Sequence, residues 1–188
     1  MTTKTFPSVT LTTAPAATPL TVAETRPILR IASSETGHDP EITRLLKAST
    51  LKVLNDTGIV LVNTTFTQKQ ESFNDEIELT RRPVSSVTSV KYYDSANALQ
   101  TLATSVYVLD TERQTIRLKP SQTWPAVYSR WDAVEVVYVA GYGAAATAVP
   151  EDLRQLVALL CRYDFDGDEF HLRAYETMVT NQFRSSYP

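Results

Sequence analysis

The chain has 188 residues, of which 43% are hydrophobic and 21% are charged. This is enough apolar material for one core, or for a domain with extended arms. The net charge of −3 argues against a protein whose main task is to grip a nucleic-acid backbone, but it is compatible with one that surrounds DNA without holding it.

The first residues predict an arm followed by a short helix. Residues 1–20 are rich in Thr, Ser and Pro, and we expect them to form an extended, weakly ordered arm. Thr21 and Glu24 have the spacing of a capping box, which marks a helix start. Pro27 removes a backbone donor, so this helix is expected to be short and to end near Ile31.

A second helix is predicted over residues 40–57. Asp39 is the expected N-terminal cap and Pro40 suits the first helical position. Apolar residues then recur at helical spacing, and Gly58 is expected to end the helix in a left-handed conformation.

From Ile59 onward the hydrophobic period changes to two, which is typical of strands. Several short apolar runs separated by turn residues predict a compact antiparallel β unit over residues 59–143. Trp124 and Trp131 are expected to cover its core or one of its ends. The predicted strands are 59–73 with a bend near Asn63, 77–79, 84–90, 99–102, 106–109, 115–118 and 134–139.

Pro150 begins a third predicted helix, which runs to about residue 165. The fold class expected from these elements is α+β, with an N-terminal helical pair and a C-terminal helix packed as a bundle, and with a central antiparallel β unit. The expected domains are the arm over 1–20, a domain over 21–165 and a terminal docking segment over 166–188. In that last segment most residues are polar, and the large apolar residues interspersed among them are Phe170, Tyr175, Met178, Phe183 and Tyr187.

No sequence motif for catalysis occurs, and we expect neither an enzyme nor a cofactor. The segment Gly141-Tyr142-Gly143 lacks the further glycine and the lysine of a phosphate loop and reads as a strand-ending turn. His38 and His171 are the only histidines and are expected to be solvated surface residues. Cys161 is the single cysteine and lies in an apolar run, which is typical of a buried thiol in a reducing cytoplasm.

Two clusters of charged residues are expected to lie on the surface of the protein. The segment Asp164–Glu169 resembles a calcium loop, but its glycine falls at the fourth position and the twelfth position is Tyr175, so an acidic hinge between helices is expected and no metal site. Arg81 and Arg82 follow Asp75, Glu76 and Glu78, which favours surface charge pairing. The two arginines can also contact DNA phosphates or the acidic residues of a neighbouring subunit.

Aromatic residues in the β unit raise the possibility of sugar or base stacking. They are Tyr92, Tyr93, Trp124, Tyr128 and Trp131. Aromatic residues are also common cross-strand partners in small β units, and this interpretation is favoured here. No apolar run approaches 18 residues, and the first residues lack the apolar core of a signal peptide, so no membrane association is expected.

Several short motifs occur in a specific order between about residues 20 and 165. They are Ile28-Leu29-Arg30-Ile31, Thr57-Gly58, Arg82-Pro83-Val84, Val87-Thr88-Ser89-Val90-Lys91-Tyr92-Tyr93-Asp94, Tyr107-Val108-Leu109-Asp110, Trp124-Pro125, Val137-Tyr138-Val139-Ala140-Gly141-Tyr142-Gly143 and Val149-Pro150-Glu151-Asp152-Leu153-Arg154. In this order they resemble the head-tail connector (adaptor) family of tailed bacteriophages. Pro27 and the alanine-rich link 144–149 depart from the family pattern.

The resemblance implies a structural protein of the virion neck, assembled in the host cytoplasm. Twelve copies are expected to form a ring beneath the portal protein, extend the DNA channel and bind a stopper or tail completion protein, with DNA passing without sequence-specific contact. As a hypothesis, residues 170–188 dock on the portal, with Phe170, Tyr175, Met178, Phe183 and Tyr187 as anchors and Arg184 as a charge partner.

Other functions remain open at this stage. A second virion module, such as a stopper, a tail terminator or a minor tail protein, shares the strand-rich centre, although the two-helix start favours the connector. A small carbohydrate- or nucleic-acid-binding β module is the alternative outside the virion.

Overall fold

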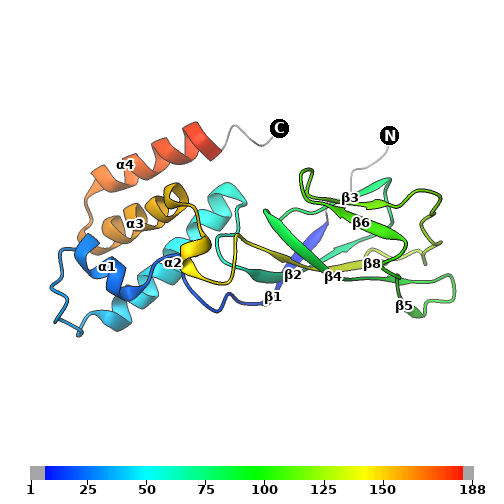
Figure 1. The fold of residues 1–188 in the computed structure, drawn as a ribbon, viewed down its shortest axis with the longest axis horizontal. Coiled ribbons are helices and arrows are strands. Elements are labelled where there is room, and N and C mark those ends of the chain that lie inside the picture. The colour runs from blue at the N-terminus through cyan, green and yellow to red at the C-terminus, as the bar shows by residue number, and fades with distance from the viewer. Residues whose placement is uncertain (1–6, 184–188) are drawn as a thin grey trace. The chain divides into compact units, whose positions relative to one another are not determined.

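A computed structural model describes residues 7–183, which form two compact units (Figure 1). The helical unit is built from Pro15–Val62 and from the residues that follow Gly141, and the β unit from Asn63–Gly141 and a strand near the N-terminus. The α+β class is therefore confirmed. The described part of the expected terminal segment over 166–188 is helical and belongs to the helical unit, and its docking role stays a prediction.

The helical unit contains four α-helices and two shorter turns. α3 packs against both α2 and α4, and α1 contacts α2 and α3. Leu153, Leu156 and Leu160 of α3 are almost completely buried and form the centre of the core. The elements are α1 (Val22–Ile28), α2 (Asp39–Thr57), η1 (Ala146–Ala148), α3 (Glu151–Asp166), α4 (Glu169–Met178) and η2 (Val179–Phe183).

The start of α1 follows the sequence prediction closely. The Thr21 hydroxyl accepts a hydrogen bond from the Glu24 backbone at 3.2 Å, and the Glu24 carboxylate accepts one from the Thr21 backbone at 2.8 Å. These bonds satisfy two amide groups that have no partner inside the helix. They are also the main reason why the pKa of Glu24 is lowered, with Arg154 adding to the effect.

The start of α2 differs from the prediction. Asp39 is the first residue of the helix rather than its cap, and the preceding residue His38 makes no capping bond. The Asp39 carboxylate is instead held by Arg26 of α1, whose Nε donates at 2.9 Å in a two-pronged ion pair. A bidentate charged pair is a stronger interaction than a cap, so it determines where the carboxylate points. Gly58 ends α2 with φ of 72°, as predicted.

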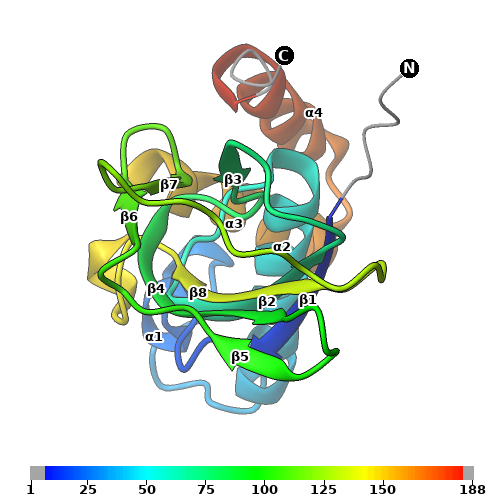
Figure 2. The same cartoon turned by 90° about the vertical axis from the view of Figure 1, so that its right-hand side faces the viewer.

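The β unit consists of two antiparallel sheets (Figure 2). The five-stranded sheet has the order β1-β2-β8-β4-β5, and the three-stranded sheet has the order β3-β7-β6. The buried Gln68 of β2 connects the two sheets, because its amide donates to the Glu78 carbonyl of β3 at 2.7 Å. The strands are β1 (Ser8–Thr13), β2 (Thr64–Gln70), β3 (Glu76–Glu78), β4 (Val84–Tyr93), β5 (Leu99–Thr101), β6 (Tyr107–Asp110), β7 (Thr115–Leu118) and β8 (Val134–Ala140).

Strand β4 carries two bulges against its partner β8. Val84, Val87 and Val90 are three residues apart, whereas their partners Ala140, Tyr138 and Val136 on β8 are two apart. The register shifts between Val84 and Ser86 and again between Val87 and Ser89, so that each valine still meets a buried residue of β8. The bulges thus allow valines that are three residues apart on β4 to pair with residues that are two apart on the regular strand β8.

Strand β1 is a difference from the predicted arm. Ser8 pairs with Lys69, and the pairing continues along β2 to Thr13. The Thr12 and Thr67 hydroxyl groups are 2.6 Å apart, which adds a cross-strand hydrogen bond. Threonine and valine favour extended backbone, so the same threonine-rich composition that suggested a loose arm also suits an edge strand.

Candidate functional site

The predicted docking residues on α4 divide into exposed and buried side chains. Phe170 is 69% exposed and is the most exposed of the large hydrophobic residues in the described part of the chain. Tyr175 is only 1% exposed, and Met178 and Phe183 are half-buried and pack against the core. Tyr175 is therefore a core residue in this fold rather than a surface anchor. Arg184 and Tyr187 lie outside the described residues.

The acidic segment before α4 is a junction between two helices, as predicted. Gly167 ends α3 with φ of 72°. Asp168 then caps α4, because its carboxylate accepts a hydrogen bond from the Phe170 backbone at 2.9 Å. The Asp166 carboxylate accepts another from the Asp168 backbone at 3.0 Å. These carboxylates are occupied by backbone amides, and the junction fixes Phe170 in the first turn of α4.

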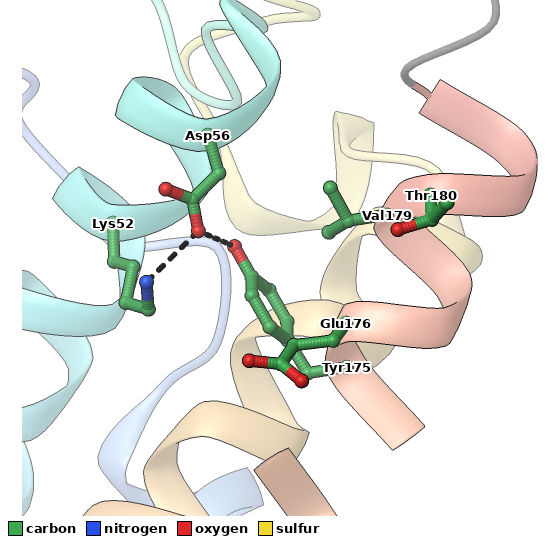
Figure 3. A pocket seen from close by; sticks show the side chains of 6 residues that line it. All are labelled: Lys52, Asp56, Tyr175, Glu176, Val179 and Thr180. Atoms are coloured by element: carbon green, nitrogen blue, oxygen red, sulfur yellow. Dashed lines mark hydrogen bonds and ion pairs between the residues drawn. The ribbon is translucent and has the colours of Figure 1, made fainter. Parts of the chain in front are cut away.

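A polar cavity of about 330 Å³ lies between α2 and α4 (Figure 3). The Asp56 carboxylate is its centre, because it accepts a hydrogen bond from the Tyr175 hydroxyl at 2.7 Å and pairs with Lys52 at 3.0 Å. Glu176 and Thr180 complete the rim. Because Tyr175 of α4 and Lys52 of α2 both bind the Asp56 carboxylate of α2, these polar contacts join α4 to α2.

A second cavity of about 430 Å³ opens at the end of α1 and the start of α4. It is lined by Arg30, by Arg162 of α3 and by His171 of α4, together with apolar residues. His171 is 7% exposed, which corrects the expectation of a solvated surface histidine. The histidine turns inward because α4 packs on α3, a contact that the sequence alone does not reveal.

Cys161 is buried, as its apolar sequence context predicts. Its Sγ lies 3.4 Å from the Ser49 hydroxyl of α2. Burial raises the pKa of the thiol to about 11, since a thiolate is poorly solvated in this core. Because the thiolate is the nucleophilic form, Cys161 is not activated for chemistry at neutral pH.

Arg81 and Arg82 behave differently from each other. The Arg82 guanidinium pairs with Glu78 at 3.0 Å, which confirms local charge pairing for this residue. Glu76 pairs instead with Arg117 at 2.7 Å across β3 and β7. Arg81 forms no side-chain ion pair within residues 7–183, although its backbone donates to the Tyr138 hydroxyl at 3.3 Å. Arg81 is thus the arginine of this pair whose guanidinium is available for another molecule.

The aromatic residues of the β unit mostly pack on one another. Phe73 stacks on Trp124 with centroids 4.6 Å apart, and Tyr92 meets Phe73 edge-on at 5.8 Å. Arg130 lies over the Tyr93 ring at 3.8 Å and binds Asp132, whose pKa it lowers. Trp131 differs from the expectation of a covering residue, because it is 66% exposed.

The described residues offer little for metal or membrane chemistry. Between residues 7 and 183 there is no group of three or more His, Cys, Asp or Glu placed to hold a metal ion. In the same range, no helix has the length and apolar character needed to cross a bilayer. The features left for function are exposed side chains such as Phe170 and Trp131 and the cavity at Arg30.

Comparison with solved structures shows which proteins share this fold. A chain from the neck of an empty gene transfer agent (GTA) particle, computed with C6 symmetry, has a TM-score of 0.71 and 27% identity, over 86% of each chain. A chain from the neck of the native GTA particle, computed with C12 symmetry, has a TM-score of 0.69 and 27% identity, over 84% of this chain and 82% of that one. A chain from the virion of the native GTA particle has a TM-score of 0.68 and 26% identity, over 83% of each chain.

These similarities confirm the resemblance found in the sequence. The chain is similar, over most of its length, to neck components of phage-like particles, the region that connects head and tail. No protein-family model and no curated protein sequence matches the chain.

Proposed function

We propose that the chain is a head-tail connector (adaptor) of a tailed phage or phage-like particle. Twelve copies form a ring beneath the portal protein, extend the DNA channel and provide a platform for a stopper or tail completion protein. The role is structural, and DNA passes through the ring without sequence-specific binding.

The observation that carries this proposal is the similarity to neck chains over more than four-fifths of both partners. One of these necks was computed with C12 symmetry and another with C6 symmetry, and both symmetries fit a ring of twelve copies. A cyclic ring requires two different complementary surfaces on each subunit. A chain made of a helical unit and a β unit, each with exposed apolar residues, can supply them.

Docking on the portal is proposed to use the face around Phe170. A large aromatic side chain that is 69% exposed is a typical anchor for a protein partner. The chain beyond Phe183, with Arg184 and Tyr187, belongs to the same proposed segment. Arg81 is proposed to contact either a neighbouring subunit or the DNA in the channel.

Imaging by cryo-electron microscopy tests the function directly. The purified chain is mixed with portal rings encoded by the same genome. A twelvefold ring stacked on the portal is the expected result. A ring that binds only to the distal end of an already occupied neck identifies a stopper, and one that binds only to a tail tube identifies a tail terminator.

Point substitutions test the docking face better than truncation does, because removing residues 170–188 also removes Tyr175 and Val179 from the core. We expect Phe170→Ser to weaken portal binding by about 2 kcal/mol, or roughly 30-fold in Kd. Leu51→Ser is the matched control, since Leu51 is 55% exposed on α2 and lies outside the proposed face. Biolayer interferometry on immobilised portal measures the affinity of both variants. Equal affinity of the two variants would contradict the assignment of Phe170.

A further inference from the structure

The cavity at the end of α1 combines positive charge with an apolar wall. Its volume of about 430 Å³ is at the lower end of the range for small-ligand sites. Ile28, Leu159 and Phe170 contribute apolar surface. Arg30 and Arg162 contribute guanidinium groups, and neither forms an ion pair within the part of the chain that the structure describes.

Two residues that line this cavity each have a buried nitrogen atom without a hydrogen-bond partner. They are Nδ1 of His171 and Nε of Arg162, and within residues 7–183 no group accepts from or donates to either. The His171 side chain is more than nine-tenths buried, and its other nitrogen, Nε2, faces Asp166 at 3.8 Å and Asp168 at 3.9 Å. Leaving a buried polar atom without a partner is unfavourable, so both side chains gain if a small rotation brings these atoms to a ligand in the cavity.

The end of α1 determines where Arg30 lies. Arg30 follows α1 with φ of 60°, the left-handed region in which glycine is the usual residue. This is the cap conformation of a Schellman motif, in which the Ile31 backbone donates to the Arg26 carbonyl at 2.9 Å and the Arg30 backbone to the Pro27 carbonyl at 3.1 Å. The side chain of Arg30 lines the cavity, so the cap positions a guanidinium group at the site.

We propose that this cavity binds the carboxylate of an Asp or Glu side chain, presented by an acidic peptide segment of the protein that docks beside Phe170. The two guanidinium groups bind the carboxylate oxygens, His171 lines the same cavity, and the apolar wall receives the neighbouring side chain of the peptide. A DNA phosphate has no apolar group that would contact the apolar wall, whereas a peptide has apolar side chains, so a peptide is the favoured ligand. The identity of the partner rests on the proposed connector function, whereas the binding chemistry does not.

The chain itself offers a specific probe of the site, because it has only two histidines. His171 lines the cavity, whereas His38 lies at the start of α2 and is not among the lining residues. The side-chain signals of both are followed by NMR in the full-length chain at fixed pH. The chain is titrated with acetyl-Leu-Glu-amide, with the uncharged acetyl-Leu-Gln-amide and with inorganic phosphate.

We expect the glutamate dipeptide to shift the His171 signals in a saturable manner and to leave those of His38 unchanged. The glutamine dipeptide is expected to bind about tenfold more weakly, because the charged hydrogen bonds are lost. Equal binding of the two dipeptides would overturn the proposal. So would a response to phosphate that equals the response to the glutamate dipeptide, since the site is then a simple anion site.

Two variants separate binding from folding. Arg30→Gly removes the guanidinium but suits the left-handed backbone, so thermal unfolding is expected to be unchanged or to occur at a higher temperature while dipeptide affinity falls at least about tenfold. Arg162→Gln is expected to have the same effect on affinity. Arg173→Gln is the matched control, because Arg173 is exposed on α4 and lies outside this cavity. Unchanged affinity in Arg30→Gly would contradict the site.

The dipeptide titration tests the cavity, and the portal experiment tests the connector function, so the failure of one is distinguishable from the failure of the other. Dipeptide binding without portal binding supports the site and refutes the proposed partner. Portal binding that is unaffected by Arg30→Gly, in a chain that also ignores the dipeptides, supports the connector function and refutes the site.

Discussion

At the scale of single residues, burial decides what the chemically reactive groups of the helical unit can do. Tyr175 and Cys161 both lie in the core, although one is on α4 and the other on α3. The Tyr175 hydroxyl is bound to Asp56, and the Cys161 thiol is close to Ser49. Each side chain therefore contributes to the stability of the unit, and each contribution can be measured.

The Cys161 thiol provides a prediction about pH. Burial raises its pKa from 9.0 to about 11, so between these values the folded chain keeps a proton that the unfolded chain releases. The contribution of the protonated Cys161 thiol to the free energy of unfolding is fully present below about pH 9, and it is lost as the pH rises toward 11. We expect urea denaturation to show a steeper fall in stability between pH 9 and 11 for the natural chain than for Cys161→Ala.

A thiol reagent gives an independent check on the same residue. At pH 8 the reagent DTNB should leave Cys161 unmodified in the native chain and modify it fully in urea. Rapid modification of the native chain would show that the thiol is accessible and would contradict the assigned burial.

Tyr175→Phe tests the hydrogen bond between α4 and α2. Losing the hydroxyl leaves the Asp56 carboxylate with Lys52 and costs about 1 kcal/mol of stability, the typical net value of one hydrogen bond. Tyr128→Phe is the control, because Tyr128 is 42% exposed and its hydroxyl forms no hydrogen bond within residues 7–183. Chemical denaturation of both variants measures the difference, and equal stability would show that the bond contributes nothing.

At the scale of secondary-structure elements, the pairing of β4 with β8 makes a prediction about deletions. Deleting Thr88 removes one bulge and leaves Val87 opposite Tyr138, so the β unit should still fold. Deleting Val137 from β8, which has no bulge of its own, turns buried residues on one side of the deletion toward the opposite face. The cost is about 3–5 kcal/mol for two or more valine-sized side chains.

Near-ultraviolet circular dichroism distinguishes these two deletions. The Thr88 deletion is expected to retain the aromatic signal and a cooperative thermal transition, and the Val137 deletion to lose both. Loss of the fold in both variants would mean that the bulge itself is essential to the sheet.

The same elements show what the sequence can and cannot predict. Hydrophobic period and turn residues were sufficient for α2, α3 and most strands, because these depend on local pattern. They did not predict β1, since its threonines are compatible with either a loose arm or an edge strand, and pairing with β2 decides the matter. The exposed Phe170 is predicted as a docking residue from composition, whereas the cavity at Arg30 requires the end of α1 to meet α3 and α4, which follow more than 100 residues later in the sequence.

At the scale of the whole molecule, the charge of −3 is compatible with the proposed ring, in which DNA passes without being held. A free chain of this charge has few opportunities for the release of counterions that drives binding to DNA. At about 150 mM salt we expect no complex with a short DNA duplex at micromolar concentrations, as measured by fluorescence anisotropy. Arg81→Glu should give the same result, and tight binding by the natural chain would contradict a passive channel.

The path of the chain has a consequence for biosynthesis. The segment Asn63–Gly141 lies between the two halves of the helical unit, with α1 and α2 before it and α3 and α4 after it. On a ribosome, the β unit can therefore close while α1 and α2 still lack the helices that cover their apolar faces. Those faces stay open until α3 emerges, and the loop to be closed is long, which slows folding. The newly made helical pair is thus the part of the nascent chain that most needs protection from aggregation, and its core is complete only after α3 and α4 have been synthesised.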